Sequence, residues 1–196
     1  MKRFSLAAGL LAFSIFPSVA HADADQVIEP SEGREVAVPM HPTRQIVTKD
    51  ATSSGLVVYE IMMDGRAPGT PPHRHENEDE FLYVTQGEVS VQIEDTVHRV
   101  TEGAMVVKPR GQFHAFWNGS SEPAKMILVV AGDGDFEGFF NAVEAAAPDM
   151  GQPNPFQARP APLAAHARMD ALAGDSGITI AMDRLAEEAV EIYTPK

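Results

Sequence analysis

The chain has 196 residues, of which 44% are hydrophobic and 22% are charged, and this is the composition of one globular domain or of one domain with a small appendage. Its 28 acidic residues against 15 basic ones give a net charge of −13, which argues against nucleic acid and anionic membrane surfaces as partners. The chain contains no cysteine, so disulfides, thiolate zinc sites and cysteine nucleophiles are excluded.

The N-terminus has the three parts of a secretory signal peptide. Lys2 and Arg3 form a positive start, residues 4–16 are mostly apolar, and Ala20-His21-Ala22 has the small residues of a cleavage site. We therefore predict a signal peptide over residues 1–22, cleaved after Ala22, and a periplasmic or secreted protein with no membrane partner once it is cleaved. The alternative is an uncleaved N-terminal anchor, but the apolar run is too short for a stable transmembrane helix.

Short strands are predicted through the middle of the chain. Residues 23–42 are polar and interrupted by prolines, so we expect an N-terminal arm with one short strand at residues 35–38. The residues that follow contain runs that are rich in β-branched residues or alternate in polarity, separated by turn residues such as Asn118-Gly119. The predicted strands are residues 56–63, 80–85, 89–93, 97–100, 104–108, 113–117 and 125–131. Short strands with such close turns indicate an all-β sandwich or barrel.

Residues 133–196 differ from the strands before them and predict a C-terminal helical extension. Asp135 is a suitable N-cap for a helix that runs to about Ala147. Four side chains recur along one face of this helix and are expected to pack on the barrel: Phe136, Phe139, Phe140 and Val143. After a proline-rich connection, the remaining expected elements are a helix at residues 163–172, a segment at residues 178–180 and a helix near residues 183–190.

Four potential metal ligands occur at spacings that suit one site on a β-structure. His73 and His75 are two residues apart, so on a strand their side chains point to the same face. Glu80 follows on the next strand, where it can return to that face, and His114 comes from a strand late in the barrel. Three neutral imidazoles and one carboxylate predict a site for one divalent transition metal, which is Fe, Mn, Ni or Cu, with Zn as a further option. The alternative is a set of buried polar groups, but such groups would partner best through a metal.

The two segments that contain these ligands, residues 73–87 and residues 103–118, resemble the two sequence motifs of the cupin superfamily. The first, His-x-His, four residues, Glu, six residues, Gly, runs from His73 to Gly87, although the glycine that usually precedes it is displaced. The second motif is complete, and its fixed residues are Gly103, Pro109, Gly111, His114 and Asn118. The resemblance covers about residues 55–132. It implies a cupin jelly-roll β-barrel, which we place at residues 43–132, with the glycines, the proline and the asparagine in structural roles.

A Phe-Glu-Gly-Phe-Phe segment at residues 136–140 and the late helical tail resemble bacterial cupins of the quercetin 2,3-dioxygenase-like group. This resemblance implies a dioxygenase acting on a hydroxylated aromatic or enolisable small molecule, with Glu80 as both metal ligand and catalytic base. Cupin barrels also include metal-dependent isomerases, lyases and decarboxylases, and non-catalytic binding proteins, so these alternatives stay open. Cupin arms often pair with a second subunit, and a homodimer is therefore a further expectation.

Strand parity predicts an apolar pocket for a small-molecule substrate beside the metal, because side chains two residues from a ligand share its face. The predicted lining residues are Met62, Leu82, Val84 and Phe116. The acidic residues Glu76, Glu78 and Asp79 between the ligands are expected to form a solvated turn, and the alternative is that they shape the electrostatic potential of the pocket. The histidines outside the motifs are isolated and are expected at the surface: His41, His98 and His166.

Overall fold

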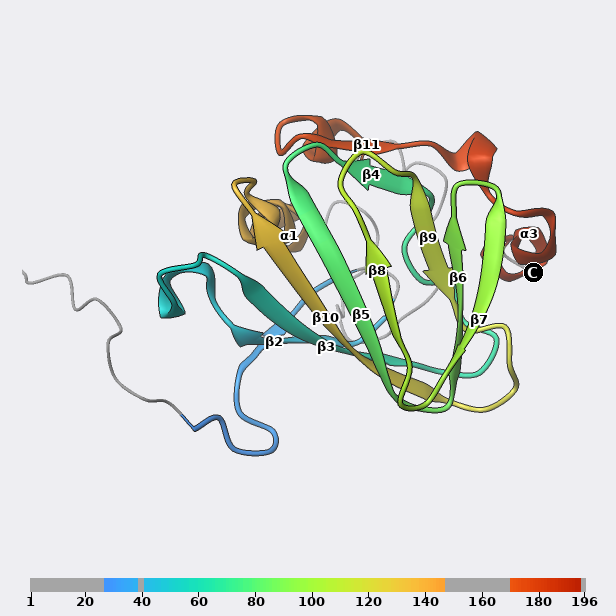
Figure 1. Ribbon diagram of the computed structural model, residues 1–196, viewed down its shortest axis with the longest axis horizontal. Helices are drawn as coiled ribbons and strands as arrows, with labels where there is room; N and C mark the ends of the chain where they lie inside the picture. The colour runs from blue at the N-terminus through green and yellow to red at the C-terminus, as the bar shows by residue number, and fades with distance from the viewer. Residues whose placement is uncertain (1–26, 39–40, 147–169, 195–196) are drawn as a thin grey trace, which may run out of the picture.

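The computed structural model of the protein describes residues 27–38, 41–146 and 170–194, which form two antiparallel β-sheets and several short helices (Figure 1). Sheet A has six strands in the order β1-β2-β3-β10-β5-β8, and sheet B has five in the order β11-β4-β9-β6-β7. The all-β jelly-roll fold expected from the sequence is confirmed. The predicted signal peptide at residues 1–22 lies outside the described residues.

The predicted strands are present, each within two residues of its expected ends. Sheet A consists of β1 (Arg34–Val36), β2 (Thr43–Val47), β3 (Val57–Met63), β5 (Glu78–Gln86), β8 (Met105–Lys108) and β10 (Ala124–Gly132). Sheet B consists of β4 (His73–His75), β6 (Glu88–Ile93), β7 (Thr96–Thr101), β9 (His114–Trp117) and β11 (Ile178–Ile180). The strand β2 was not predicted, because the polar residues Thr43, Arg44 and Gln45 at its start hide its alternation.

The hydrophobic core lies between the two sheets, and strand β3 shows how the faces are divided. Its buried side chains are Val57, Tyr59, Ile61 and Met63, which alternate with side chains on the outer face. Met62 is 46% exposed on that outer face, so its predicted place in an inner pocket is wrong. Both faces of this strand carry apolar residues, so hydrophobicity alone did not fix its parity. Glu60 was the available signal, because a charged side chain two residues from Met62 indicates that their shared face points to solvent.

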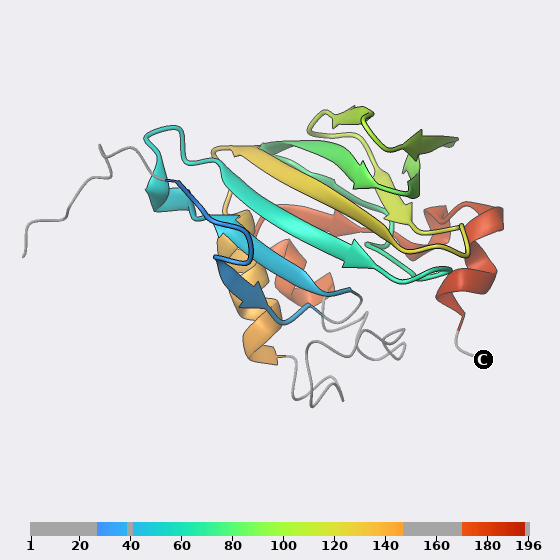
Figure 2. The same cartoon turned by 90° about the horizontal axis from the view of Figure 1, so that it is seen from below.

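Helix α1 (Phe136–Ala146) matches the helix predicted after the barrel. Asp135 acts as its N-cap, since its Oδ1 accepts a hydrogen bond from the backbone N–H of Gly138 at 3.3 Å. The predicted aromatic stripe is buried, and the rings of Phe136 and Phe140 pack on Tyr59 from β3. Figure 2 shows α1 lying against the layer that contains β2 and β3.

The C-terminal segment adds a strand to sheet B. Strand β11 pairs antiparallel with β4, and the two lie side by side at the top of Figure 1. The single helix expected near residues 183–190 is wrong, because the segment instead contains η3 (Met182–Arg184), η4 (Glu187–Ala189) and α3 (Val190–Tyr193). Of the helix expected at residues 163–172, only residues 170–172 lie within the described part of the chain, and residues 170–174 are helical.

The interruption of the C-terminal helix has a tertiary cause. The side-chain amide of Gln92 on β6 donates to the carbonyl of Arg184 at 2.7 Å and accepts from the N–H of Ala186 at 2.9 Å. These backbone groups are therefore bonded to the barrel instead of to their own turn. A short 3-10 helix at Lys49–Ala51 (η1) is the remaining helical element in the part of the chain that the structure describes. None of the helices there is long and apolar enough to span a bilayer.

Candidate metal centre

The four predicted ligands come together between the sheets. His73 and His75 lie on β4, and His114 lies on β9 with its Cα directly opposite that of His73. Glu80 comes from β5 in sheet A and faces the three imidazoles across the core. One ligand atom from each residue lies within 4.8 Å of the others. Strand alternation and the pairing of two sheets thus converge the four groups on one point.

Each histidine is oriented through the ring nitrogen that faces away from this point. The Nδ1 atoms of His73 and His114 lie 2.8 Å and 3.1 Å from the carbonyl oxygens of Pro71 and Gln112. The Nδ1 of His75 lies 3.3 Å from Oε2 of Glu78. Acceptors at all three Nδ1 atoms favour a proton there and leave the Nε2 lone pairs for a metal.

The inward-facing atoms are buried and poorly partnered. The ligands are 0–2% exposed except for His73, which is 6% exposed. Nε2 of His75 and Nε2 of His114 lie 3.2 Å and 3.1 Å from the Glu80 carboxylate, yet both nitrogens and Glu80 Oε2 lack a hydrogen bond of acceptable geometry. Buried polar atoms are rarely left in this state. Three nitrogen donors and one oxygen donor around one point fit a divalent first-row metal ion.

Two of the three imidazoles, those of His73 and His114, are neutral and can donate a lone pair to a metal without first losing a proton. Burial, together with the neighbouring positive groups, lowers the pKa of His73 well below its usual value, and burial and Lys108 lower the pKa of His114. Burial also opposes a charge on His75, but the carboxylates of Glu78 and Glu80 outweigh it and raise its pKa to about 9. A metal ion must therefore displace a proton from His75 when it binds.

Glu80 is held in its ionised form. Burial alone would raise its pKa, but the ammonium group of Lys108 and the imidazole of His114 outweigh burial and keep the pKa of Glu80 well below its usual range. An ionised carboxylate is the form that coordinates a metal. The electrostatics of the site and the geometry therefore agree on Glu80 as a ligand.

Lys108 is a site residue that the sequence reasoning missed. It lies on β8 with its Cα opposite that of Glu80, it is 0% exposed, and its Nζ forms an ion pair with Glu80 Oε2. The available signal was the alternation of β8, in which Met105 and Val107 face outward and Lys108 faces inward. Lysine is almost never fully buried without a partner, so its inward position on β8 indicates a partner inside the barrel.

Glu78 was also missed, and its predicted place in a solvated turn is wrong. Its side chain is 2% exposed and supports His75, because β5 begins two residues earlier than expected and Glu78 therefore shares the inner face of Glu80. Gly134 makes room for it, since a Cβ at Gly134 would overlap the Glu78 carboxylate. Carboxylate–histidine pairs of this kind orient metal ligands.

The other motif residues form the turns that hold the strands. The backbone N–H of Gly111, at a φ of 82°, donates to the carbonyl of His75 at 2.7 Å and ties the turn before β9 to β4. The side-chain amide of buried Asn118 donates to the carbonyls of Asp64 and Glu122 at 2.9 Å and 2.7 Å. Gly87, in the turn between β5 and β6, and Gly103, in the turn between β7 and β8, also have positive φ, at 76° and 84°. Pro109 begins the turn that follows β8.

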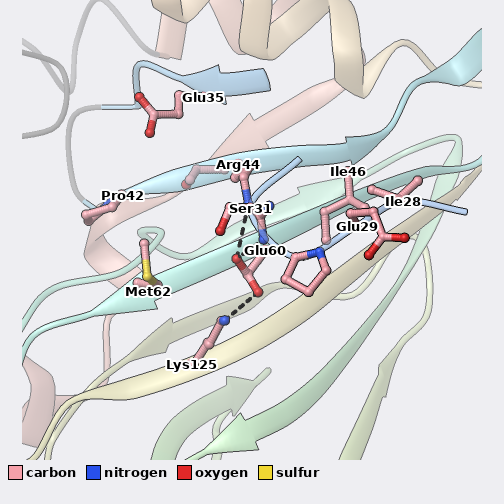
Figure 3. Close-up of a pocket in the computed structure, with 12 residues that line it drawn as sticks. Ile28, Glu29, Ser31, Glu35, Pro42, Arg44, Ile46, Glu60, Met62 and Lys125 are labelled. Carbon is pink, nitrogen blue, oxygen red and sulfur yellow. Dashed lines mark hydrogen bonds and ion pairs between the residues drawn. The ribbon is translucent and has the colours of Figure 1, made fainter. Parts of the chain in front are cut away.

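The predicted pocket residues separate into two groups. Leu82, Val84 and Phe116 are buried on the inner faces of their strands, 0–1% exposed. Met62 instead lines a pocket of about 590 Å³ on the outer face of sheet A, shown in Figure 3. That pocket contains none of the four candidate ligands, so we place the chemistry at the buried cluster, where the donors converge.

The histidines outside the motifs also differ from one another. His98 is exposed as predicted, and His166 lies outside the described residues. His41 is 2% exposed, so its predicted surface position is wrong. Its ring lies 5.6 Å from that of Phe116, and its Nδ1 lies 2.8 Å from Thr43 Oγ1. Burial lowers the pKa of His41 to about 4, so it is a neutral core residue.

Elements from the C-terminal third cover the cluster. The ring of Phe136 from α1 lies 5.3 Å from that of His75, and β11 pairs along β4. The hydroxyl of Tyr193 donates to, or shares its proton between, the carbonyls of Thr70 and Phe116 at 2.8 Å and 2.9 Å. This contact joins α3 to the loop before β4 and to β9, so the segment beyond the barrel closes the ligand strands.

Comparisons with known proteins agree with this architecture. A family model described as "Cupin domain" matches residues 59–130. The chain is 30% identical over 103 residues to Germin-like protein 9-3 of Oryza sativa subsp. japonica, a match that covers 47% of this chain and 48% of that protein. The chain thus spans about half the length of this curated relative.

Similar solved structures include a predicted oxalate decarboxylase from Thermotoga maritima, with a TM-score of 0.51, 17% identity, and coverage of 55% of this chain and 100% of that one. The structure of KdgF from Halomonas sp. is 26% identical with a TM-score of 0.42, covering 49% of this chain and 83% of that one. The first likeness supports the fold alone. Over the barrel, the chain is thus similar to cupin domains in sequence and to the Thermotoga maritima protein in fold.

Proposed function

We propose that this protein is an exported cupin enzyme that uses one divalent transition metal to dioxygenate a hydroxylated aromatic or enolisable small molecule. The observation that carries the proposal is the buried cluster of three imidazoles and one carboxylate, in which Nε2 of His75, Nε2 of His114 and Oε2 of Glu80 lack a hydrogen bond. His73, His75, His114 and Glu80 would hold the metal. When bound, a first-row metal supplies Lewis acidity and, for Fe, Mn, Ni or Cu, electron exchange with oxygen.

The protein's own residues would bind and shield the substrate. Leu82, Val84 and Phe116 provide an apolar wall on the inner faces of both sheets, which suits an aromatic or enolisable skeleton. Phe136 of α1 lies against His75 and β11 pairs along β4, and these elements would limit the access of water to the ligand cluster and so strengthen electrostatic interactions inside it. Of the four ligands His73 is the most exposed, so we expect the substrate to approach from its side.

Glu80 has a second proposed role, as the base that takes a proton from the substrate hydroxyl at one carboxylate oxygen. Its Oε1 lies toward His75 and its Oε2 toward His114 and Lys108, so one oxygen can coordinate while the other receives the proton. Glu80→Gln tests this role, because an amide oxygen still coordinates weakly but does not act as a base. Metal retained with turnover lost is the expected result.

A non-oxidative reaction is the second candidate, and Lys108 favours it. An ammonium group beside the ligands can stabilise the negative charge of an enolate, which isomerases, lyases and decarboxylases all generate. Such an enzyme would work without oxygen and would accept Zn or Mn. A non-catalytic binding protein is the remaining alternative, and it would hold the same small molecules without turnover.

Elemental analysis of the mature protein from its native compartment is the first test. We expect about one Fe, Mn, Ni or Cu per chain, and oxygen consumption with flavonol-like or enediol compounds. Turnover without oxygen uptake would support the second candidate.

His73→Ala and His114→Ala should each lose the metal, whereas His98→Ala, which changes an exposed histidine on β7, should keep it. Full metal content in the site variants would contradict the proposal.

Export is tested separately. The proposed signal peptide predicts that protein recovered from the periplasm or medium begins at Asp23, which N-terminal sequencing of the purified protein measures. A mature chain that still begins at Met1 would contradict cleavage after Ala22.

A further inference from the structure

Lys108 occupies a position that strand packing normally gives to an apolar side chain. Its neighbours on β8, Met105 and Val107, are 56% and 52% exposed, whereas Lys108 is 0% exposed. Its Nζ lies 5.6 Å from the centroid of the Phe116 ring, over the apolar wall described above. Burying an ammonium group while two hydrophobic side chains face solvent lowers the stability of the folded protein. A buried lysine at such a position is therefore typical of a functional site.

The hydrogen-bonding capacity of Lys108 exceeds what its neighbours use. An ammonium group has three N–H donors. Among the residues that the structure describes, the single acceptor group paired with Nζ is the Glu80 carboxylate, and Nζ has no hydrogen bond of acceptable geometry. The Glu80 carboxylate is itself shared with His75 and His114. Donors of Lys108 therefore remain for a further acceptor beside the ligand cluster.

The charges of the site point to the same conclusion. The imidazoles are neutral when they coordinate a metal. A divalent ion and Lys108 together carry one more positive charge than the carboxylates of Glu80 and Glu78 balance, and all of these side chains are buried. Excess charge in a buried site is costly, and an anionic ligand that contacts both cations reduces this cost.

We propose that Lys108 and the metal together form a subsite for an anionic oxygen of the substrate, either a carboxylate or a deprotonated hydroxyl group. The proposal rests on the proposed metal centre and narrows its substrates to small molecules that bind as anions. The metal holds one oxygen of the substrate, and Lys108 donates charge-assisted hydrogen bonds to the same oxygen or to its neighbour. Phe116, under the ammonium group, contacts the apolar part of the molecule.

Azide binding to the Cu(II)-loaded protein tests this subsite, because azide is a small anion whose coordination changes the visible spectrum. We expect Lys108→Met to keep about one metal per chain and to weaken azide binding about tenfold to a hundredfold, the effect of losing a hydrogen bond to a charged group. Imidazole, which coordinates without charge, should bind the variant as it binds the wild-type protein. Acetate should compete with azide in the wild-type protein.

The chain offers a matched control in Lys125, a lysine of the same sheet that lies on β10 and pairs with Glu60 on the outer face of sheet A (Figure 3). Lys125→Met should leave azide affinity within about twofold of the wild-type value, because its charge is on the far side of the sheet. Lys108→Gln is a second variant, neutral but able to bond to Glu80, and it should lose azide affinity as Lys108→Met does.

The outcomes that overturn the subsite are distinct from those that overturn the metal centre. Wild-type protein without metal contradicts the proposed function and the subsite together. Unchanged azide affinity in both Lys108 variants at full metal loading contradicts the subsite alone. Equal loss of azide and imidazole affinity, or loss of the metal itself, would mean that Lys108 acts by holding Glu80 in place, and this also overturns an anion subsite.

Discussion

Two lysine–glutamate pairs lie on opposite faces of sheet A and have different surroundings. On the outer face, Glu60 pairs with Lys125 at 2.6 Å and with Arg44 at 2.5 Å (Figure 3), and the side chain of Lys125 is 37% exposed. On the inner face, Glu80 pairs with Lys108, and both side chains are at most 2% exposed. The outer carboxylate has two cations and access to water, whereas the inner one is buried beside Lys108 and two imidazoles, of which that of His75 keeps its proton until a metal binds.

The difference shows what burial does to the same chemical pair. At the surface, water satisfies whatever the ion pair leaves over, and the pair contributes little to stability. In the core, the loss of hydration exceeds the attraction unless further hydrogen bonds are made. The inner pair therefore fits a site whose remaining hydrogen bonds are made to a bound metal or ligand. The outer pair needs no such ligand, because water and Arg44 compensate its charges.

The largest expected difference between the pairs is in metal content. Glu80→Ala removes a ligand and should reduce the metal from about one per chain to a trace, whereas Glu60→Ala should retain it fully. Because a metal that binds only the folded state stabilises it, saturation should add about 3–4 kcal/mol to the unfolding free energy of wild-type and Glu60→Ala protein, and nothing to Glu80→Ala. Elemental analysis and thermal melts with and without metal measure both effects. An equal metal increment in the two variants would place the metal elsewhere.

The next largest effect is on the stability of the metal-free protein. Lys108→Met removes the ammonium partner of the buried Glu80 carboxylate and leaves the protonated His75 as the remaining cation beside it, so it should cost about 3 kcal/mol of unfolding free energy, the lower end of the range for a broken buried ion pair. Lys125→Met should cost about 1 kcal/mol or less, because Arg44 and water remain. The double variant Glu80→Gln, Lys108→Met should be more stable than Lys108→Met alone. Urea unfolding in a chelator measures all three, and similar losses for the two lysines would erase the contrast between the faces.

A smaller effect is expected from the residues that support the inner site. Gly134→Ala places a Cβ against the Glu78 carboxylate, so Glu78 must move away from His75. We expect metal affinity to fall about 10–100-fold, the usual effect of losing a partner behind a ligand. Gly174→Ala is the matched control, since a Cβ there meets nothing within 4 Å and its backbone is helical. Metal titration of both variants decides the point, and equal affinities would remove Glu78 from the account of the site.

The smallest effect concerns salt. The Glu60–Lys125 pair is partly exposed, so raising the ionic strength to about 1 M should screen most of its contribution, which is about 1 kcal/mol or less. Subtracting the Glu60→Gln value from the wild-type unfolding free energy at low and high salt measures the ion pairs of Glu60 with Lys125 and Arg44 together. The inner pair, shielded from ions, should show no such change in the corresponding Glu80→Gln comparison. A similar salt response on both faces would mean that ions reach the inner site.

Local sequence patterns were enough to predict most of the strands, helix α1 and the ligand cluster. The alternation and turn residues predicted seven of the strands, and the aromatic spacing after Asp135 predicted α1, because both depend on neighbours in the sequence. The His73–His75 spacing, together with Glu80 and His114, predicted the ligand cluster that the structure brings together. The same reasoning placed Met62 inside, because both faces of β3 carry apolar residues, and Glu78 outside, because β5 begins two residues earlier than the pattern indicates.

The sequence by itself determined most of the strands, helix α1, the ligand set and the acidity of the chain. The tertiary structure decided that Lys108 is buried opposite Glu80, that Glu78 supports His75, and that β11 pairs with the ligand strand β4 at the edge of sheet B. Each of these is a contact between residues far apart in the chain or on different strands. Such contacts depend on strand order and register, which no local pattern contains, and this is why the residues that complete the site emerged only from the fold.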